Sequence, residues 1–309
     1  MKKFFKKYFR KTVSSLLLAA FLILTFYFLD PGSMLNEIKI LASRPAVILF
    51  ILTSYFFAFL ARGIAWKIYL KNKTSLKTCM YGLFYSLLLN HLLPVKAGDF
   101  ARVGILKARE PQISSHEAFN SVIVLRMLDT AILFGMAFTG LAFLELPMNA
   151  MLIVWLAAGA ATVAIFISFR FRSFFDRHIT IMKKAFSGWS GVYIVALTFT
   201  SWILEAAVVY GVILNGGSEF SFIQAIWVNS ITVAGQIFQI TPGAIASYEA
   251  VMVFALGASG IAGENAYSAA IITHGLKYIF TFIVGGAAFA AYPVPTHLLK
   301  KWTRERGNE

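Results

Sequence analysis

Several ionisable residues stand inside apolar stretches of this sequence, where a buried charge is costly. Arg126 and Asp129 lie three residues apart in VIVLRMLDTAIL, so on a helix they share one face and can form an ion pair. Glu205 in SWILEAAVVYGVIL has no basic residue within one turn, so it must find a partner on another helix, hold a proton or face water. Burying such a group costs on the order of 2.5–3.5 kcal/mol on insertion scales. Each is therefore a candidate functional residue, although an ion pair can also serve only to lock two helices together.

A second pair of polar residues stands in the last apolar stretch. His274 and Lys277 are three residues apart in THGLKYIF, so they point the same way from a helix. We count them as secondary candidates, together with Asn90 and Glu205.

Two apolar stretches run directly into a proline, a glycine and an acid. The residues concerned are Pro94, Gly98 and Asp99 in the first stretch, and Pro242, Gly243 and Glu249 in the second. Proline ends the incoming helix, glycine permits an abrupt change of direction, and a new helix begins near the acid. A helix that begins at membrane depth presents free N–H groups and the positive end of its dipole, which together favour an anion such as phosphate.

The charged residues at these breaks have more than one interpretation. Asp99 and Glu249 fit equally as first-turn acids that cap N–H groups and as ligands for a proton or substrate. Arg102, one turn after Asp99, is a candidate ligand for a lipid head group, or a residue that extends to the membrane surface.

The composition requires that these residues work inside a membrane. The chain has 309 residues, 59% apolar and 14% charged, and a mean hydropathy of +0.72, which excludes a water-soluble domain. Its net charge of +14 comes from basic clusters that flank apolar stretches among Phe and Trp. These clusters predict contact with anionic lipid head groups rather than nucleic acid. The single cysteine, Cys79, excludes an internal disulfide framework and a multi-cysteine metal site, and we expect no metal and no cofactor.

The apolar runs predict an all-α polytopic membrane protein, a single integral membrane domain over 1–309. About six runs are long enough for full transmembrane helices. They cover roughly residues 13–29, 45–61, 118–144, 151–169, 189–214 and 267–292.

Charge distribution predicts how the two broken segments are arranged. If residues 78–93 crossed the membrane fully, the basic segment 170–184 would lie outside, against the positive-inside rule. If 78–110 instead forms a re-entrant hairpin from the cytoplasm and 222–262 a second hairpin from the opposite side, every basic cluster falls inside. We therefore predict two opposed re-entrant helical hairpins, as in a possible inverted repeat.

The same distribution predicts the location of the ends. The basic segment 1–12 and the tail 293–309 are both expected in the cytoplasm, and the protein in a bacterial-type inner (cytoplasmic) membrane.

Three runs of the sequence, in order, carry a resemblance to a known family. NHLLPVKAGDFARVGIL, SVIVLRMLDTAIL and TPGAIASYEAVMVFAL together resemble the lysylphosphatidylglycerol synthase transmembrane-region family, also called flippase-like. The resemblance runs from the second span to the last helix. The matching positions that it implies for a head-group site are Asn90, Pro94, Gly98, Asp99, Arg102, Arg126, Asp129, Pro242, Gly243 and Glu249.

The chain departs from the family pattern at four positions within these three runs. Asp99 stands where glutamate is usual, and Leu125 precedes Arg126 where the family often has glutamate. Ala244 and Tyr248 replace a second glycine and an arginine. The loss of the arginine at position 248 bears on which lipid head group the protein recognises.

What the resemblance implies is lipid translocation. In two-domain relatives this region moves an aminoacylated phospholipid between leaflets, while a separate soluble transferase domain attaches the amino acid. Too few residues follow Tyr292 for such a domain, so we expect no lipid synthesis and no enzyme activity. The implied partners are membrane lipids, whether anionic, aminoacylated or polyprenyl-linked, and a separate lipid-modifying or glycosyl transferase. The oligomeric state is left open.

Three functions are compatible with these features. The first is a flippase or scramblase for a phosphate-bearing lipid or lipid-linked precursor. The second is an ion-coupled secondary transporter of a small anionic metabolite, with Asp99, Glu205 or Glu249 carrying a proton. The third, a membrane-embedded enzyme, lacks sequence support: His116 and Glu117 begin no HExxH motif, and no nucleotide-binding motif is present.

Overall fold

The computed structural model describes residues 23, 25–26, 30–93, 97–143, 172–215, 219–236, 241–261 and 263–293. These residues are helical apart from short turns, and none of them forms a strand. Segment 1–12, most of 13–29, the span at 151–169, all but the first residue of 293–309, and Pro94 lie outside the described residues.

Among the described residues, four helices are long and apolar enough to cross a membrane. They are α3 (Pro45–Tyr69), α6 (Ser115–Phe143), α9 (Gly188–Asn215) and α12 (Gly263–Ala291). At about 1.5 Å of rise per residue, each exceeds the roughly 30 Å of the hydrocarbon core. They correspond to four of the six predicted spans, and the other two fall mostly or wholly on residues outside the described ranges. The protein is therefore a multi-pass membrane protein with an all-α fold, as predicted.

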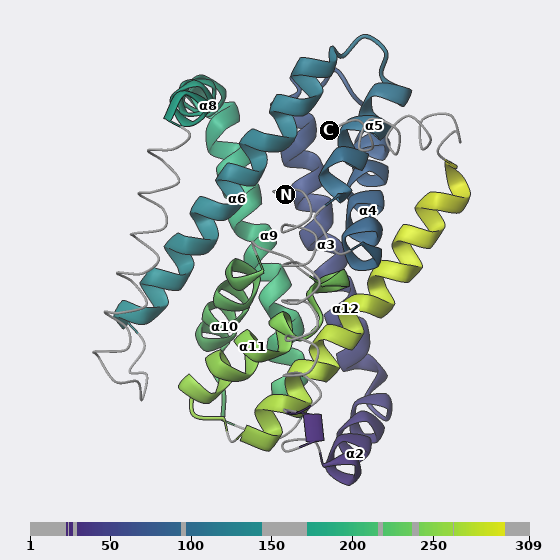
Figure 1. Ribbon diagram of the computed structural model, residues 1–309, viewed down its shortest axis with the longest axis vertical. Helices are drawn as coiled ribbons and strands as arrows, with labels where there is room; N and C mark the ends of the chain where they lie inside the picture. The colour runs from purple at the N-terminus through teal and green to yellow at the C-terminus, as the bar shows by residue number, and fades with distance from the viewer. Residues whose placement is uncertain are drawn as a thin grey trace, which may run out of the picture.

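Shorter helices occupy the two broken segments. Helices α4 and α5 pack together toward the upper end of the bundle in Figure 1, whereas α10 and α11 pack together toward the lower end. Their bounds are Leu76–Leu92 for α4, Gly98–Arg109 for α5, Phe222–Gly235 for α10 and Ser247–Ala258 for α11, with one 3-10 turn, η1, at Pro242–Ala244. Helix α5 begins at the predicted Gly98, and η1 contains the predicted Pro242 and Gly243. Re-entry from opposite membrane faces stays a prediction.

Two further helices lie at the ends of the molecule. Helix α2 (Pro31–Ala42) precedes α3 at the lower end, and α8 (Arg172–Ala185) lies at the upper end. Figure 1 shows α8 end-on, whereas the long helices run vertically, so α8 lies across the bundle. Its sequence, RSFFDRHITIMKKA, is strongly amphipathic, which is typical of a helix at a membrane surface.

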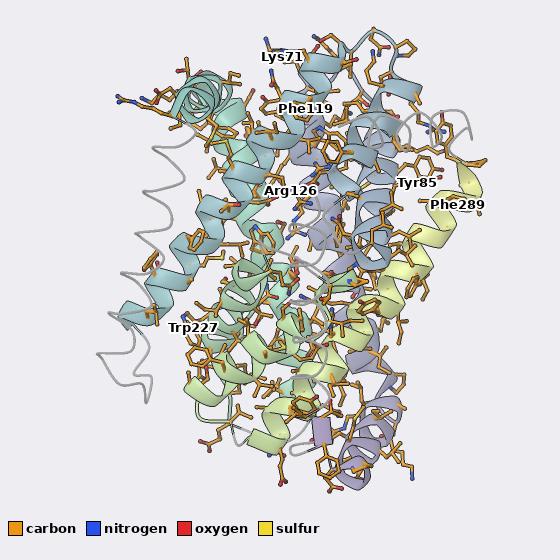
Figure 2. All side chains as sticks on the ribbon, viewed as in Figure 1. Lys71, Tyr85, Phe119, Arg126, Trp227 and Phe289 are labelled. Atoms are coloured by element: carbon orange, nitrogen blue, oxygen red, sulfur yellow. The ribbon has the colours of Figure 1, made fainter. Side chains whose placement is uncertain are left out.

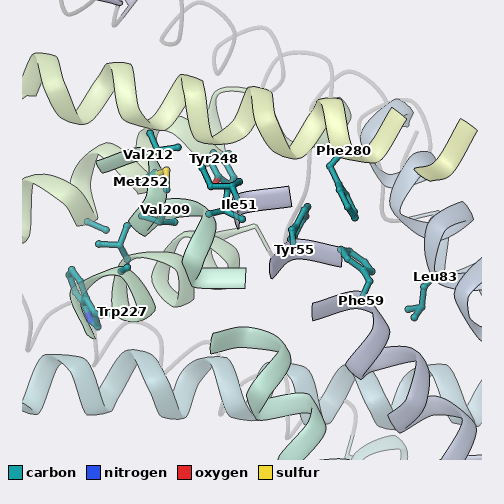
Figure 3. Packing of buried hydrophobic residues seen from close by; sticks show 14 of the residues in the cluster. Ile51, Tyr55, Phe59, Leu83, Val209, Val212, Trp227, Tyr248, Met252 and Phe280 are labelled. Carbon is teal, nitrogen blue, oxygen red and sulfur yellow. The ribbon is translucent and has the colours of Figure 1, made fainter. Parts of the chain in front are cut away.

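The apolar core runs along α3, α9 and α12 (Figure 3). Tyr55 and Phe59 of α3 contact Phe280 of α12, with ring centroids 4.6 and 6.0 Å apart. Tyr248 of α11 lies further along the same core, fully buried. Cys79 of α4, the only cysteine in the chain, is also fully buried here. Several of the buried polar side chains lie where the short helices end.

One carboxylate joins the start of α4 to the end of α5. Glu110 accepts hydrogen bonds from the Thr74 and Thr78 hydroxyls at 2.9 and 3.0 Å, from the Ser75 N–H at 3.3 Å, and from the Gln112 amide at 3.0 Å. Burial raises the pKa of Glu110, but these hydrogen bonds lower it further, so its pKa lies below the ordinary value. The carboxylate therefore stabilises this end of the hairpin when it is ionised.

Glu110→Gln is expected to destabilise the protein by about 1.5 kcal/mol at pH 7, because hydrogen bonds to a charged acceptor are lost. A lowered pKa in the folded state means that this stabilisation is present at neutral pH and disappears as the pH falls through that pKa. The gap between wild type and variant should therefore close below about pH 4. Thermal unfolding in detergent at both pH values measures this. Glu117→Gln, which removes an exposed ion pair with Lys73, should cost less than about 1 kcal/mol, and equal losses in the two variants would contradict the prediction.

Candidate functional site

A polar cavity of about 150 Å³ lies where the short helices end against the long ones. Its wall takes residues from both broken segments and from α3, α6, α9 and α12. The charged and polar residues that line it include Arg62, Ser86, Asn90, His91, Arg102, Arg126, Asp129, Glu205, Gln236, Tyr248, His274 and Lys277. The structure thus brings together most of the residues singled out in the sequence, and their role in binding stays a prediction.

The described candidates that do not line the cavity are bound to other polar groups near it. Gly98 donates its backbone N–H to Asn90 Oδ1 at 2.9 Å. Asp99 binds Arg126, Glu249 binds His274, and the Pro242 carbonyl accepts from the Tyr278 hydroxyl at 3.4 Å. Gly243 lines the cavity itself.

Arg126 pairs chiefly with Asp99 rather than with the predicted Asp129. Arg126 Nε and Nη2 donate to the Asp99 carboxylate at 3.0 and 2.8 Å, in a bidentate arrangement. Asp129 is 3.8 Å from Arg126 Nη1 and accepts from Trp202 Nε1 at 3.2 Å. The i,i+3 spacing permitted the predicted pair, but α5 supplies a carboxylate with better geometry. The ion pair therefore joins the first hairpin to a long helix.

Glu205 finds its partners on two other helices. Its carboxylate accepts from Arg62 Nη2 of α3 at 2.8 Å and from Lys277 Nζ of α12 at 2.9 Å. Lys277 also donates to Asn229 Oδ1 at 3.2 Å, and the Arg62 guanidinium stacks 4.1 Å over the Trp202 ring. Of the three possibilities considered for Glu205, the structure shows the first, a partner on another helix.

At the start of each of the two predicted half-helices, one backbone N–H group is already hydrogen-bonded to a nearby side chain. The Gly98 N–H is taken by Asn90, and the Ala246 N–H is taken by Glu249 Oε2 at 2.7 Å. Glu249 therefore fills one of the two roles considered for it, that of a first-turn cap. These two N–H groups are therefore already bound by side chains nearby in sequence, and convergence of the two N-termini on a phosphate stays a prediction.

Four buried polar atoms in the cavity wall have no hydrogen-bond partner among the described residues. They are Ser86 Oγ, Arg102 Nε, Gln236 Nε2 and Tyr248 Oη. Arg102 is only 3% exposed; its guanidinium lies 4.5 Å over the Trp66 ring, and Asp99 Oδ1 is 3.9 Å from its Nη1. Buried polar groups are rarely left unpaired, and each costs about 1–3 kcal/mol. Since all four atoms can donate, the wall suits a guest rich in acceptor oxygens.

An apolar groove of about 590 Å³ adjoins this cavity between α5 and α6. Apart from Asp99, Arg126 and Thr130, its lining is apolar: Phe100, Val103, Phe119, Val122, Ile123, Met127 and Ala131. Arg126 lines both spaces, and Figure 2 shows it on α6 with Phe119 further up the same helix. The ion pair of Asp99 with Arg126 therefore stands where the polar cavity and the apolar groove meet.

Several residues of this site escaped sequence reasoning. Arg62 was counted with a cytoplasmic basic cluster, because the apolar run ends at Ala61, yet α3 continues to Tyr69 and buries it. Ser86, His91 and Trp202 carry no local signal. Of these residues, only Arg62 could have been found from the sequence, because the helical pattern of α3 continues for two turns beyond it, to Tyr69.

The fold and the cavity define a multi-pass membrane protein with a buried polar site beside an apolar groove. The chain belongs to the lysylphosphatidylglycerol synthase TM region family, whose model matches residues 12–285. The family identifies it as a membrane protein involved in lipid handling. No curated protein and no solved structure matches the chain.

Proposed function

We propose that this protein translocates a phosphate-bearing lipid or lipid-linked precursor between the leaflets of the inner (cytoplasmic) membrane, without covalent chemistry on the lipid. One observation carries the proposal: a polar cavity lies next to an apolar groove. The ion pair of Asp99 with Arg126 stands where they meet, and the residues that line the cavity include buried donors without partners among the described residues. An amphiphile has the same two parts. Family membership supports a lipid as the guest.

The polar cavity suits the phosphate of the head group. Arg102 Nε, Ser86 Oγ, Tyr248 Oη and Gln236 Nε2 are buried donors without partners among the described residues. A phosphate has several acceptor oxygens, so it can accept hydrogen bonds from these donors. Without a partner, each buried donor destabilises the folded protein. Arg102 adds a positive charge, and its ion pair with Asp99 is long, at 3.9 Å, because Asp99 lies closer to Arg126, at 2.8 Å.

The apolar groove suits an acyl or polyprenyl chain. Its lining is almost entirely hydrocarbon, and its volume of about 590 Å³ is larger than that of the cavity. Each buried methylene contributes about 0.8 kcal/mol, which favours a long chain over a small water-soluble anion. This groove distinguishes the proposal from transport of a small anionic metabolite, which would need no such surface.

The ion pair of Asp99 with Arg126 controls the junction. A phosphate that moves from groove to cavity passes Arg126, which lines both. Because guanidinium binds phosphate and carboxylate with the same bidentate geometry, the phosphate can replace Asp99 on Arg126 during passage. The partners of the protein are then membrane lipids and, upstream, a separate transferase that modifies them.

Arg102→Ala is expected to slow translocation of a fluorescently labelled phosphatidylglycerol in proteoliposomes by about ten-fold or more, since a charge-assisted hydrogen bond contributes about 1.5–3 kcal/mol. Dithionite, which reduces only the label in the outer leaflet, measures the rate. The matched control is Arg172→Ala, because Arg172 is an exposed arginine of α8 paired with exposed Asp176. A folded Arg102→Ala protein that moves the lipid at the wild-type rate would remove Arg102 from the mechanism.

A further inference from the structure

His274 lies between two oxygen atoms, one on each side of its ring. Its Nδ1 is 2.6 Å from Glu249 Oε1, and its Nε2 is 3.1 Å from the Gly243 carbonyl oxygen. A carbonyl oxygen only accepts, so Nε2 must carry a proton. The contact between Nδ1 and Oε1 then needs one further proton, on the imidazole or on the carboxyl. His274 and Glu249 are both buried, 4% and 5% exposed.

We propose that His274 and Glu249 together bind one exchangeable proton, and that this proton couples lipid movement to a proton gradient. The coupling rests on the proposed function, whereas the proton site does not. The proton reaches the pair through the polar cavity, which His274 lines.

The proton balance of the pair is simple. In the loaded state the pair is an imidazolium with a carboxylate, or a neutral imidazole with a carboxylic acid; both hold the same protons and have no net charge. Releasing one proton to the cavity leaves a carboxylate and a neutral imidazole with a single N–H, and a net charge of −1. That N–H can serve Glu249 or the Gly243 carbonyl but not both, so one contact then sets lone pairs against each other.

Because an ionised carboxylate is the stronger acceptor, the remaining N–H stays with Glu249, and the contact that is lost is the one to the Gly243 carbonyl, at the break between α10 and α11. Gly243 lies in η1 with φ of +59°, and a Cβ there would lie 1.6 Å from the Tyr278 hydroxyl oxygen, so η1 rests directly on α12. Tyr278 donates to the Pro242 carbonyl at 3.4 Å and His274 binds the Gly243 carbonyl at 3.1 Å. Proton loss removes the hydrogen bond from His274 to the Gly243 carbonyl. The protonated pair therefore favours η1 docked on α12, and the deprotonated pair favours its release.

Other titratable groups face this pair from the helices around it. Helix α11 stacks the Tyr248 ring 4.0 Å from the His274 ring, and α4 brings the His91 ring to 6.4 Å. On α12 itself, Tyr278 lies 4.8 Å from His274, and Lys277 is bound to Glu205 of α9. Lys277 thus pairs with a carboxylate that it shares with Arg62, and the carboxylate that contacts His274 is that of Glu249.

The first test does not depend on lipid transport. Nuclear magnetic resonance of protein labelled with nitrogen-15 histidine, in lipid nanodiscs, follows each imidazole through a pH titration. We expect one histidine, absent in His274→Gln, with both ring nitrogens hydrogen-bonded at neutral pH and a single proton step that Glu249→Gln removes. The signal of exposed His116, identified by its absence in His116→Gln, serves as the reference for a histidine outside the pair. A His274 signal that stays in one neutral form from pH 4 to pH 10 would overturn the proton site.

The second test measures coupling. In proteoliposomes with labelled phosphatidylglycerol, a gradient of one pH unit should shift the leaflet distribution by up to about ten-fold per coupled proton. His274→Gln and Glu249→Gln should abolish the shift, while His116→Gln retains it. Wild-type protein that moves the lipid to an even distribution despite the gradient overturns the coupling and leaves the proposed function intact. Wild-type protein that moves no lipid overturns the proposed function and the coupling, and the resonance titration alone then decides the proton site.

Discussion

Replacing Glu205 by leucine is expected to lower the free energy of unfolding by about 3–5 kcal/mol, the usual cost of breaking a buried ion pair from one side. Arg62 and Lys277 bind this carboxylate at 2.8 and 2.9 Å, and the side chains of Lys277 and Glu205 are only 5% and 6% exposed. Without Glu205, α3 and α12 each carry a buried cation that has lost its shared acid. Since natural domains are stable by only about 5–15 kcal/mol, this loss is a large share of the total stability.

Thermal unfolding in detergent and gel filtration measure this effect. Glu205→Leu combined with Lys277→Met restores the original net charge of the three residues, so the double variant should be more stable than the single one. Glu117→Leu removes an acid that is paired with Lys73 at the same 2.8 Å but exposed, and should cost less than about 1 kcal/mol. A Glu205→Leu protein as stable as Glu117→Leu would show that the buried network contributes nothing to stability.

Gly98→Ala is the second substitution with a large expected effect. A Cβ at this position would lie 2.1 Å from the Ser86 carbonyl oxygen, a backbone atom that cannot rotate away. Helix α5 must therefore move from α4, which breaks the hydrogen bond from Gly98 to Asn90 and displaces Asp99 from Arg126. Overpacking of this kind costs about 1–3 kcal/mol, and the displaced ion pair should slow translocation as well.

The matched control for this variant is Gly275→Ala. Gly275 lies in the middle of α12, and a Cβ there would meet no atom within 4 Å. Alanine has the higher helix propensity by about 0.8–1 kcal/mol, so this variant should be as stable as wild type or slightly more stable. Unfolding temperatures and the rate of labelled-lipid movement should separate the two variants. If both behave alike, the close contact between α4 and α5 is not needed.

Much of the fold could be predicted because membrane helices follow from local apolar runs. The run at 45–61 predicted α3, and the break around Pro242 and Gly243 predicted the end of one short helix and the start of another. Helix ends were less predictable. The apolar run stops at Arg62, but α3 continues to Tyr69, because a charged residue that finds a buried partner does not end a helix.

The set of site residues was also largely predictable, whereas their pairing was not. Charged residues in apolar segments must meet other polar groups, so most of them lie around one cavity. Which groups meet depends on how helices pack, and Asp99 reaches Arg126 across α5 and α6 without any sequence signal. The same holds for Ser86, which is an ordinary residue in sequence and becomes significant only through burial without a partner among the described residues.

The burial of Cys79 has a practical consequence for watching this molecule move. As the chain has no other cysteine, a thiol introduced at the surface is the only one that a water-soluble label can reach, and the native residue need not be replaced. Two added thiols, one at the end of each hairpin, would carry a pair of spin labels. The distance between those labels, followed as lipid is added, would show directly whether the two hairpins separate.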